Sequence, residues 1–365
     1  MLAFPFPPRR AWALAVGALV SSLALALLSS CATTSAAAAP GSSATAPGAA
    51  RSTIASAPTA EPGPRDLRPL QLVVQGRFIG NGVSYGPHRD GQRPGGPGPT
   101  AEQLREDLKL LAPHWTLWRL DNSDSTAAAV LEVLEHEHAP VEVILGVWIA
   151  PEKTPDDRAR NQAEVDGAIR LATAYPNQVL AINVGNETQV TWSDHRVPRE
   201  LLLGYLNQVR AATKVPVTTA DDFSFWVAPE SDAVARACDF LMVHAYAMWN
   251  GKPLEQAVAF TQDKFAEVQR RHPGRLLILG ELGWATQKSG QGDQGNLIKG
   301  TPGEEEEKIF REQLLAWTTP AQIGNLFFEA FDENWKGGPE PQEVEKHWGL
   351  FRADRTPKKA MQDGR

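Results

Sequence analysis

Cysteine is scarce in this sequence, and its scarcity limits how the fold can be held together. Cys31 and Cys238 are the only two cysteines in 365 residues. Cys31 follows an apolar segment and is expected to be modified there, which leaves Cys238 unpaired and predicts no disulfide framework. Because Cys238 opens the apolar run CDFLMV, we expect a buried, chemically inert thiol.

The sequence also lacks the patterns of several other classes of protein. The formal net charge is −7, and no group of lysines and arginines is interleaved with aromatic residues, which argues against a nucleic-acid partner. The glycines of residues 80–86 do not have dinucleotide-fingerprint spacing. No Ser-His-Asp arrangement with a nucleophile elbow is visible. The EHEH letters at 135–138 fit a solvated helix face better than a metal site. No metal or organic cofactor is implied.

The N-terminal segment has the layout of an export signal. Two arginines precede an apolar stretch at residues 11–30. The stretch ends in LSSC at Cys31, which resembles the lipobox of bacterial lipoproteins. We therefore expect residues 1–31 to be a lipoprotein-type signal, and the protein to be held in the bacterial cell envelope by lipid at Cys31. The residue after Cys31 is not acidic, which favours the outer membrane. A plain cleaved signal and a retained membrane anchor are the alternatives.

Composition divides the rest of the chain into three parts. Residues 32–66 are mostly Ala, Ser, Thr, Pro and Gly, which cannot bury enough apolar surface to offset the entropy of ordering, so we expect a disordered linker. Residues 67–357 have the size of one barrel domain. Residues 358–365 are interpreted as a short polar tail.

Eight short apolar runs recur through residues 67–357 and predict parallel strands buried on both faces. Helical patterns separate them: Thr100 and Gln103 have capping-box spacing, Thr301 and Glu304 repeat it, and Pro253 marks a third helix start. Strands and helices that alternate eight times predict an α/β fold, a single (β/α)₈ TIM barrel, with an open doubly wound sheet as the alternative. The runs are 77–84, 115–120, 141–147, 179–184, 215–219, 239–244, 275–280 and 325–331.

Two glutamates stand at the ends of predicted strands. Glu187 follows the fourth run in NVGNE, and Glu281 follows the seventh in GELGW. The C-terminal ends of barrel strands meet at one mouth, so both carboxylates are expected there. Burying a carboxylate is costly, but glycoside hydrolysis needs one protonated and one ionised carboxyl group. The pair therefore predicts a glycosidase. The alternative is that one or both bond to neighbouring arginine or backbone groups in a structural role.

Other strand ends carry groups suited to binding sugar. Tyr246 follows the sixth run, where its hydroxyl can hold a nucleophile ionised by hydrogen bonding. The eighth run ends in FDENWK, in which Glu333 and Lys336 offer charged groups to sugar hydroxyls. Tyr85 and Asp121 end the first and second runs. Indole faces pack on the C–H face of a pyranose, and the tryptophans at strand ends are Trp148, Trp192, Trp226, Trp249, Trp284 and Trp335.

Taken together, these segments resemble glycoside hydrolase family 17, the β-1,3-glucanases and glucanosyltransferases, in its bacterial branch. The resemblance spans about residues 75–355. The strand-7 motif departs from the commoner Thr-Gly-Trp-Pro form at Leu282 and Ala285, which leaves the carboxylate in place and puts the aglycone side in doubt. The matching segments are GVSYGP (82–87), LGVWIAPE (145–152), INVGNE (182–187), VHAYAMW (243–249), GELGWAT (280–286) and FFEAFDENWK (327–336).

The resemblance implies a retaining double displacement on β-glucan. Glu187 would be the acid/base and Glu281 the nucleophile, with carboxyl groups about 5–5.5 Å apart. Asn186 would bond the sugar 2-hydroxyl at the reacting subsite, and Tyr246 would orient Glu281. The positions that match the cleft lining of the family are Tyr85, Glu333 and Lys336. Asp121, Trp249 and Trp284 complete the candidate binding residues.

The residues leave the outcome of the reaction open. A hydrolase resolves the glycosyl-enzyme with water, whereas a glucanosyltransferase resolves it with a second sugar, and both use the same two glutamates. A surface glucan-binding lipoprotein without turnover is a third reading, although a binder needs no acid and nucleophile together. A barrel glycosidase acting on β-1,4 or β-1,6 linkages is a fourth. The polar loop 286–300 is a candidate acceptor region, and the sequence does not indicate an oligomeric state.

Overall fold

The computed structural model describes residues 66–362. The predicted signal segment at 1–31, with its lipid-modified Cys31, lies outside the described residues, as does the predicted linker up to residue 65. Between residues 66 and 362, no helix combines the length and the apolar character needed to cross a bilayer.

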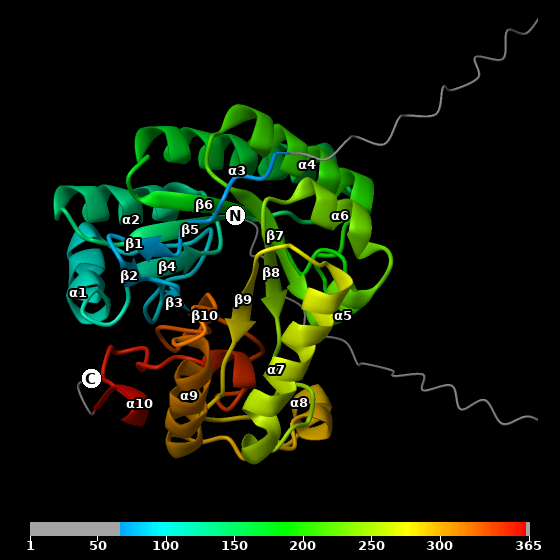
Figure 1. Ribbon diagram of the computed structural model, residues 1–365. Helices are drawn as coiled ribbons and strands as arrows, with labels where there is room; N and C mark the ends of the chain where they lie inside the picture. Colours follow the sequence, from blue (N-terminus) through cyan, green and yellow to red (C-terminus); the bar gives the residue numbers. More distant parts are fainter. Residues whose placement is uncertain (1–65, 363–365) are drawn as a thin grey trace, which may run out of the picture. The chain divides into compact units, whose positions relative to one another are not determined.

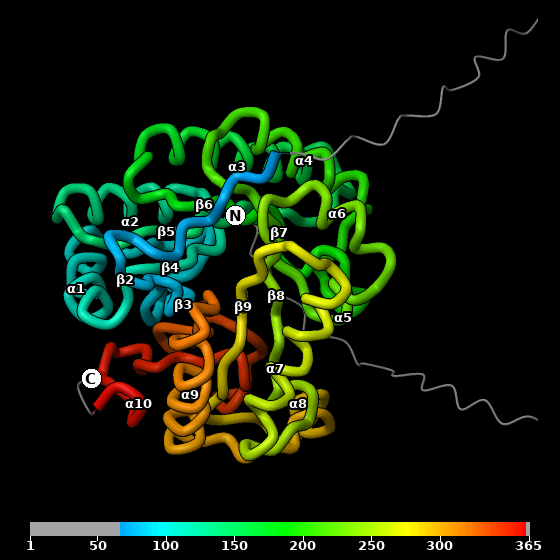
Figure 2. The backbone as a smooth tube through the Cα atoms, viewed as in Figure 1, coloured from blue at the N-terminus to red at the C-terminus, as the bar shows by residue number. Residues whose placement is uncertain are grey.

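Eight parallel strands close into a barrel in sequence order (Figure 1). The first barrel strand, β3, pairs with the last, β10, and this pairing closes the sheet (Figure 2). Each predicted apolar run overlaps one barrel strand, so the predicted (β/α)₈ TIM barrel is confirmed. The strands are β3 (Asn81–Ser84), β4 (Leu117–Leu120), β5 (Glu142–Val147), β6 (Val179–Asn186), β7 (Val217–Asp222), β8 (Leu241–His244), β9 (Leu277–Leu282) and β10 (Asn325–Phe327).

The first predicted run is divided between two sheets. Its start, β2 (Arg77–Phe78), pairs antiparallel with β1 (Val73–Val74) in a small hairpin. Gln75 and Gly76 form the turn with φ of 50° and 77°. Two positive φ values in succession give the twist that a two-residue hairpin requires. Only the end of the run enters the barrel, as β3.

Helices follow the barrel strands, and the predicted capping box at the first of them is confirmed. Gln103 N–H donates to the Thr100 hydroxyl (3.2 Å), and Thr100 N–H donates to the Gln103 side chain (2.9 Å). The helices are α1 (Ala101–Leu111), α2 (Ser125–His136), α3 (Pro155–Ala174), α4 (Arg199–Ala212), α5 (Phe223–Val227), α6 (Ser231–Ala237), α7 (Leu254–Arg271), α8 (Gly292–Leu297), α9 (Glu304–Thr318) and α10 (Lys359–Gln362), with a 3₁₀ turn at Val344–Lys346.

Two boundaries differ from the sequence prediction. Helix α9 begins at Glu304 with Gly303 as its N-cap, so Thr301 does not cap it. The Thr301 carbonyl instead accepts a hydrogen bond from the Trp284 indole (2.9 Å). The domain also continues past residue 357, because the ammonium of buried Lys358 donates to Asp332 (2.8 Å) and α10 packs against α9.

The core has an inner and an outer layer, and the inner layer stops short of the barrel mouth. Inward-facing side chains from strands β4 to β10 form an apolar cluster inside the barrel. Alternation along a strand brings every second residue to the same face. Two positions beyond inward-facing Leu117 and Met242, the inner face therefore carries Arg119 and His244. The inner cluster includes Leu117, Ile144, Ala181, Ala220, Met242, Ile278 and Leu326.

Candidate active site

Both predicted catalytic glutamates lie at the C-terminal mouth of the barrel. Glu187 directly follows β6 and is 9 % exposed, and Glu281 lies in β9 and is 6 % exposed. Strands β8 and β9 slip by one residue between the pairs Val243–Leu279 and His244–Glu281. Such an irregularity re-aims a side chain, and here it brings Glu281 to the inner face beside His244.

The carboxylate of Glu281 is held by two donors. Arg119 Nη1 lies 2.6 Å from Oε1, and the Tyr246 hydroxyl donates to Oε2 (2.8 Å). Burial alone raises the pKa of Glu281, but the charges of His244 and Arg119, with the hydrogen bonds from Arg119 and Tyr246, outweigh it and lower the pKa to about 2. Glu281 is therefore ionised at neutral pH, as a nucleophile must be.

Glu187 faces the same space from the end of β6. Its backbone N–H donates to the Ala220 carbonyl (3.0 Å), and its φ of 49° lies in the left-handed region that few non-glycine residues adopt. His244 Nδ1 lies 3.6 Å from Glu187 Oε1 and 3.6 Å from Glu281 Oε2. The two oxygens are therefore at most twice that distance apart. This bound admits the separation of about 5–5.5 Å found in retaining glycosidases.

Two buried aspartates of β7 adjoin Glu187. Asp221 accepts hydrogen bonds from the backbone N–H groups of Gln189 (2.8 Å) and Asp222 (2.9 Å), which fixes the loop after β6. Burial, reinforced by the charge of Glu187, raises the pKa of Asp221 well above its usual value. Burial is also the main reason that the pKa of Asp222 rises to about 6. Both aspartates therefore keep their protons to higher pH than a free aspartate does.

Arg119 connects the two halves of the site and was not singled out from the sequence. Its side chain is fully buried, and its second nitrogen, Nη2, donates to the Asn186 side-chain oxygen (2.8 Å) and lies 3.4 Å from Asp121. A guanidinium is a rigid fork, so one residue fixes both Glu281 and Asn186. The one feature of the sequence that could have indicated this role is an arginine inside the apolar run WTLWRL.

A second charged cluster surrounds Lys336. Its ammonium lies 2.6 Å from Glu329 and 2.8 Å from Glu333, and 4.6 Å from the centre of the Phe328 ring. Although burial opposes the ionised form, Lys336 and His88 lower the pKa of Glu333 to about 2. Glu333 also accepts from the Trp335 indole (2.9 Å). The predicted residues Glu333 and Lys336 therefore form one buried unit, with Glu329 as an additional member.

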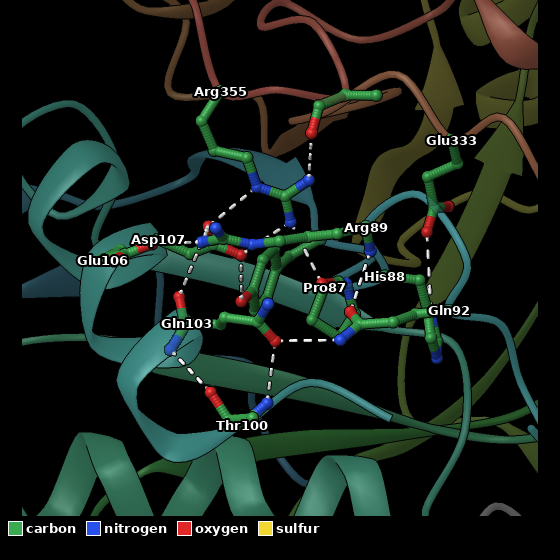
Figure 3. Close-up of polar contacts among 12 residues, drawn as sticks. Pro87, His88, Arg89, Gln92, Thr100, Gln103, Glu106, Asp107, Glu333 and Arg355 are labelled. Carbon is green, nitrogen blue, oxygen red and sulfur yellow. Dashed lines mark hydrogen bonds and ion pairs between the residues drawn. The ribbon is translucent and has the colours of Figure 1, made fainter. Parts of the chain in front are cut away.

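A buried network stands behind this cluster (Figure 3). Arg355 donates to both oxygens of Asp107 (2.9 Å each) and to the Pro87 carbonyl (3.0 Å). The next residue, His88, places Nδ1 3.6 Å from Glu333. The C-terminal segment thereby fixes the loop after β3 against Glu333.

Two of the predicted sugar-binding residues, Tyr85 and Trp284, are buried in the domain. The Tyr85 hydroxyl donates to Asp107 (3.0 Å) inside the network just described, and the residue is 3 % exposed. Trp284 is fully buried, with its ring against Phe310 and its indole N–H on the Thr301 carbonyl. The Trp284 ring is therefore closed off from the barrel mouth, and the Tyr85 hydroxyl is already engaged by Asp107.

The remaining predicted residues keep access to the mouth. Asn186, Asp121 and Trp249 are half-buried. Burial raises the pKa of Asp121, and the charges of Arg119 and Lys336 oppose that rise, so Asp121 lies between the two charged clusters. Of the other strand-end tryptophans, Trp226 is fully buried, whereas Trp148, Trp192 and Trp335 are half-buried.

The chain matches known proteins over most of its length. Residues 82–349 match the BtgE/BtgC glycoside hydrolase domain. A glucan 1,3-beta-glucosidase from Arthroderma benhamiae is 29% identical over 282 residues, which cover 73% of this chain and 86% of the relative. The solved structure of an endo-laminarinase from Formosa Hel1_33_131 is 25% identical with a TM-score of 0.66, over 78% of this chain and 87% of that one. A glycoside hydrolase family 17 β-1,3-glucanosyltransferase from Rhizomucor miehei has 25% identity and a TM-score of 0.61, over 77% and 96%.

Proposed function

This chain belongs to the BtgE/BtgC glycoside hydrolase family, and we propose that it hydrolyses β-1,3-linked glucan with retention of configuration at the anomeric carbon. The observation that carries the proposal is the pair of glutamates on either side of His244, one of them held ionised by Arg119 and Tyr246. The linkage is proposed from the names of the relatives, which are glucan 1,3-beta-glucosidases and an endo-laminarinase.

The first half of the reaction forms a covalent intermediate. Glu187 gives its proton to the glycosidic oxygen while the Glu281 carboxylate attacks the anomeric carbon, so that the bond to the leaving sugar breaks and an ester forms. The ionised state of Glu281 makes it the nucleophile. In the second half, Glu187 takes a proton from water, the water oxygen attacks the anomeric carbon, and the ester breaks.

We expect the reacting sugar to bind to side chains that other residues already hold in place. The Asn186 oxygen accepts from Arg119, so its amide N–H groups are directed to serve a sugar hydroxyl. Lys336 is held between Glu329 and Glu333, and these charged side chains form a fixed surface beside Trp335. A rigid polar wall favours one orientation of the sugar.

Transfer to a second sugar is the other candidate outcome, and one feature of the rim favours it. Trp148 follows β5, and its ring lies 4.5 Å from that of His195, which follows β6 on the acid/base side. Both residues are half-buried. An aromatic surface at that place suits an acceptor sugar, which must approach from the side of Glu187.

A product profile separates these outcomes. The protein is incubated with a linear β-1,3-gluco-oligosaccharide of defined length, and chain lengths are followed by mass spectrometry while proton NMR reports the first anomer formed. Hydrolysis predicts shorter products only, with the β-anomer first. Longer products beside shorter ones mean transfer. An α-anomer formed first contradicts retention, and the absence of products contradicts the proposed activity.

We also propose that the protein is exported and anchored in the cell envelope through lipid at Cys31. The support is the apolar stretch that ends in LSSC. Metabolic labelling with a fatty acid tests it: label on the wild-type protein and none on Cys31→Ser is expected. Equal labelling of both proteins contradicts the assignment.

A further inference from the structure

His244 occupies an unusual position for a histidine. It ends β8, is fully buried, and places one ring nitrogen, Nδ1, 3.6 Å from an oxygen of each catalytic glutamate. A nitrogen-to-oxygen hydrogen bond is about 2.7–3.2 Å long. Both separations therefore exceed a hydrogen bond by a small, equal amount, and neither ring nitrogen has a hydrogen-bond partner within residues 66–362.

The surroundings hold the ring in this place. A side chain at Gly280 would stand 3.1 Å from the ring carbon Cδ2 and 3.3 Å from Nε2, so the absence of one there gives the imidazole its space. Titratable and charged groups face this region from every neighbouring strand. They are Glu187 after β6, Asp221 and Asp222 in β7, Glu281 in β9, Arg119 in β4 and Tyr246 after β8 itself.

We propose that the Nδ1–H group of His244 is one hydrogen-bond donor shared by the two catalytic glutamates, and that it follows the negative charge from Glu281 to Glu187 and back during each turnover. The inference rests on the proposed double displacement and adds a positioning residue to it. It explains why a single nitrogen lies equally far from both carboxylates, at a place where either one is reached by a small side-chain movement.

The negative charge changes place because the first half of the reaction transfers it from Glu281 to Glu187, and the second half returns it. In the free enzyme Glu281 carries the charge and Glu187 carries the proton. After the first half, the Glu187 proton is on the departing sugar and Glu281 is a neutral ester, so the charge lies on Glu187. Arg119 and Tyr246 both donate to Glu281. His244 Nδ1, 3.6 Å from Glu187 Oε1, is placed to donate to Glu187 once it is ionised.

The test compares three replacements in the full-length protein. In His244→Asn the amide nitrogen occupies nearly the place of Nδ1, so the shared donor is kept. In His244→Gln, a polar control of similar size, the amide reaches the place of Nε2 instead. In His244→Leu the donor is removed. Each variant is assayed with an aryl β-laminaribioside that has a poor leaving group, for which the first half limits the rate, and with a dinitrophenyl one, for which the second half does.

Loss of a hydrogen bond to a charged group corresponds to about a 10- to 100-fold change in rate. We expect that loss in both halves for the Leu and Gln variants, and activity within about tenfold of wild type for Asn. We also expect the acid limb of kcat/KM against pH to move further to higher pH in Leu and Gln than in Asn, because all three variants lack the charge of His244 beside Glu281 and only Leu and Gln also lack the donor. Intact-mass spectrometry should detect accumulated glycosyl-enzyme in these two variants with the dinitrophenyl substrate.

Two results overturn the inference. The first is an Asn variant as slow as the Leu and Gln variants with the same pH profile in all three, which means that the donor at the place of Nδ1 has no role. The second is near-wild-type rates for Leu. If Leu does not fold, the comparison of Asn with Gln decides the question. A wild-type protein without turnover contradicts the proposed function, whereas an active wild type with unaffected variants contradicts this inference alone.

Discussion

Replacing Arg119 by methionine should move the acid limb of activity upward by one pH unit or more. Arg119 contacts Glu281 at 2.6 Å and is one of the two charges that lower the pKa of that carboxyl from 4.5 to about 2. That difference corresponds to ~3 kcal/mol, at about 1.36 kcal/mol for each pH unit. Removing one of the two charges should return the pKa of Glu281 a large part of the way to 4.5.

Arg119→Met should also lower the stability of the folded protein. Because the pKa of Glu281 in the folded state lies below its value in the unfolded chain, its ionisation stabilises the protein above pH 4.5, and this stabilisation is lost as the pH falls through about 2. Breaking a buried ion pair from one side costs about 3–5 kcal/mol. The free energy of unfolding of Arg119→Met at pH 7, measured with urea, should fall by a similar amount.

Arg119→Lys is the matched control. It keeps the charge near Glu281 but lacks the planar fork that also binds Asn186. We expect the acid limb of kcat/KM to stay close to wild type while KM rises, because Asn186 loses its partner. An acid limb that is unchanged in folded Arg119→Met would falsify the assignment of Arg119 as the group that keeps Glu281 ionised.

Three further predictions follow from the site. Glu281→Gln should abolish turnover and leave laminari-oligosaccharide binding within about tenfold by calorimetry, and wild-type rates would refute its role as nucleophile. Lys336→Met leaves Glu329 and Glu333 buried with no ammonium between them, so it should lower the melting temperature and raise KM, and unchanged values of both contradict the cluster described here. Trp284→Phe should reduce stability by about 1–3 kcal/mol without changing KM, because the ring is buried away from the mouth, and a raised KM contradicts that placement.

The parts of the site that could be predicted are those set by local pattern. Glu187 and Glu281 each follow an apolar run of strand length, and parallel strands in a barrel present their ends at one mouth. The barrel followed from the same runs. Thr100 and Gln103 are close in sequence, so their capping box was visible as a spacing.

The parts that could not be predicted depend on contacts between distant segments. Arg119 and His244 stand inside apolar strands, and their direction is fixed by strand register, including the slip beside Glu281. Tyr85 was predicted to line the cleft, but its hydroxyl donates to Asp107, which is held by Arg355 from 248 positions away in the sequence. Trp284 is covered by the segment at Thr301. Such long-range partners cannot be predicted from the residues next to each position in the sequence.

The central claim is that Glu281 forms a covalent bond with the sugar, and trapping that bond tests it directly. The protein is treated with a 2-deoxy-2-fluoro-β-laminaribiosyl fluoride, whose fluorine at carbon 2 slows the second half of the reaction, and is then digested and sequenced by mass spectrometry. We expect one added laminaribiosyl group per chain, on the peptide that contains Glu281, and none in Glu281→Gln. A label on any other residue, or none on a wild-type protein that turns over laminari-oligosaccharides, contradicts it.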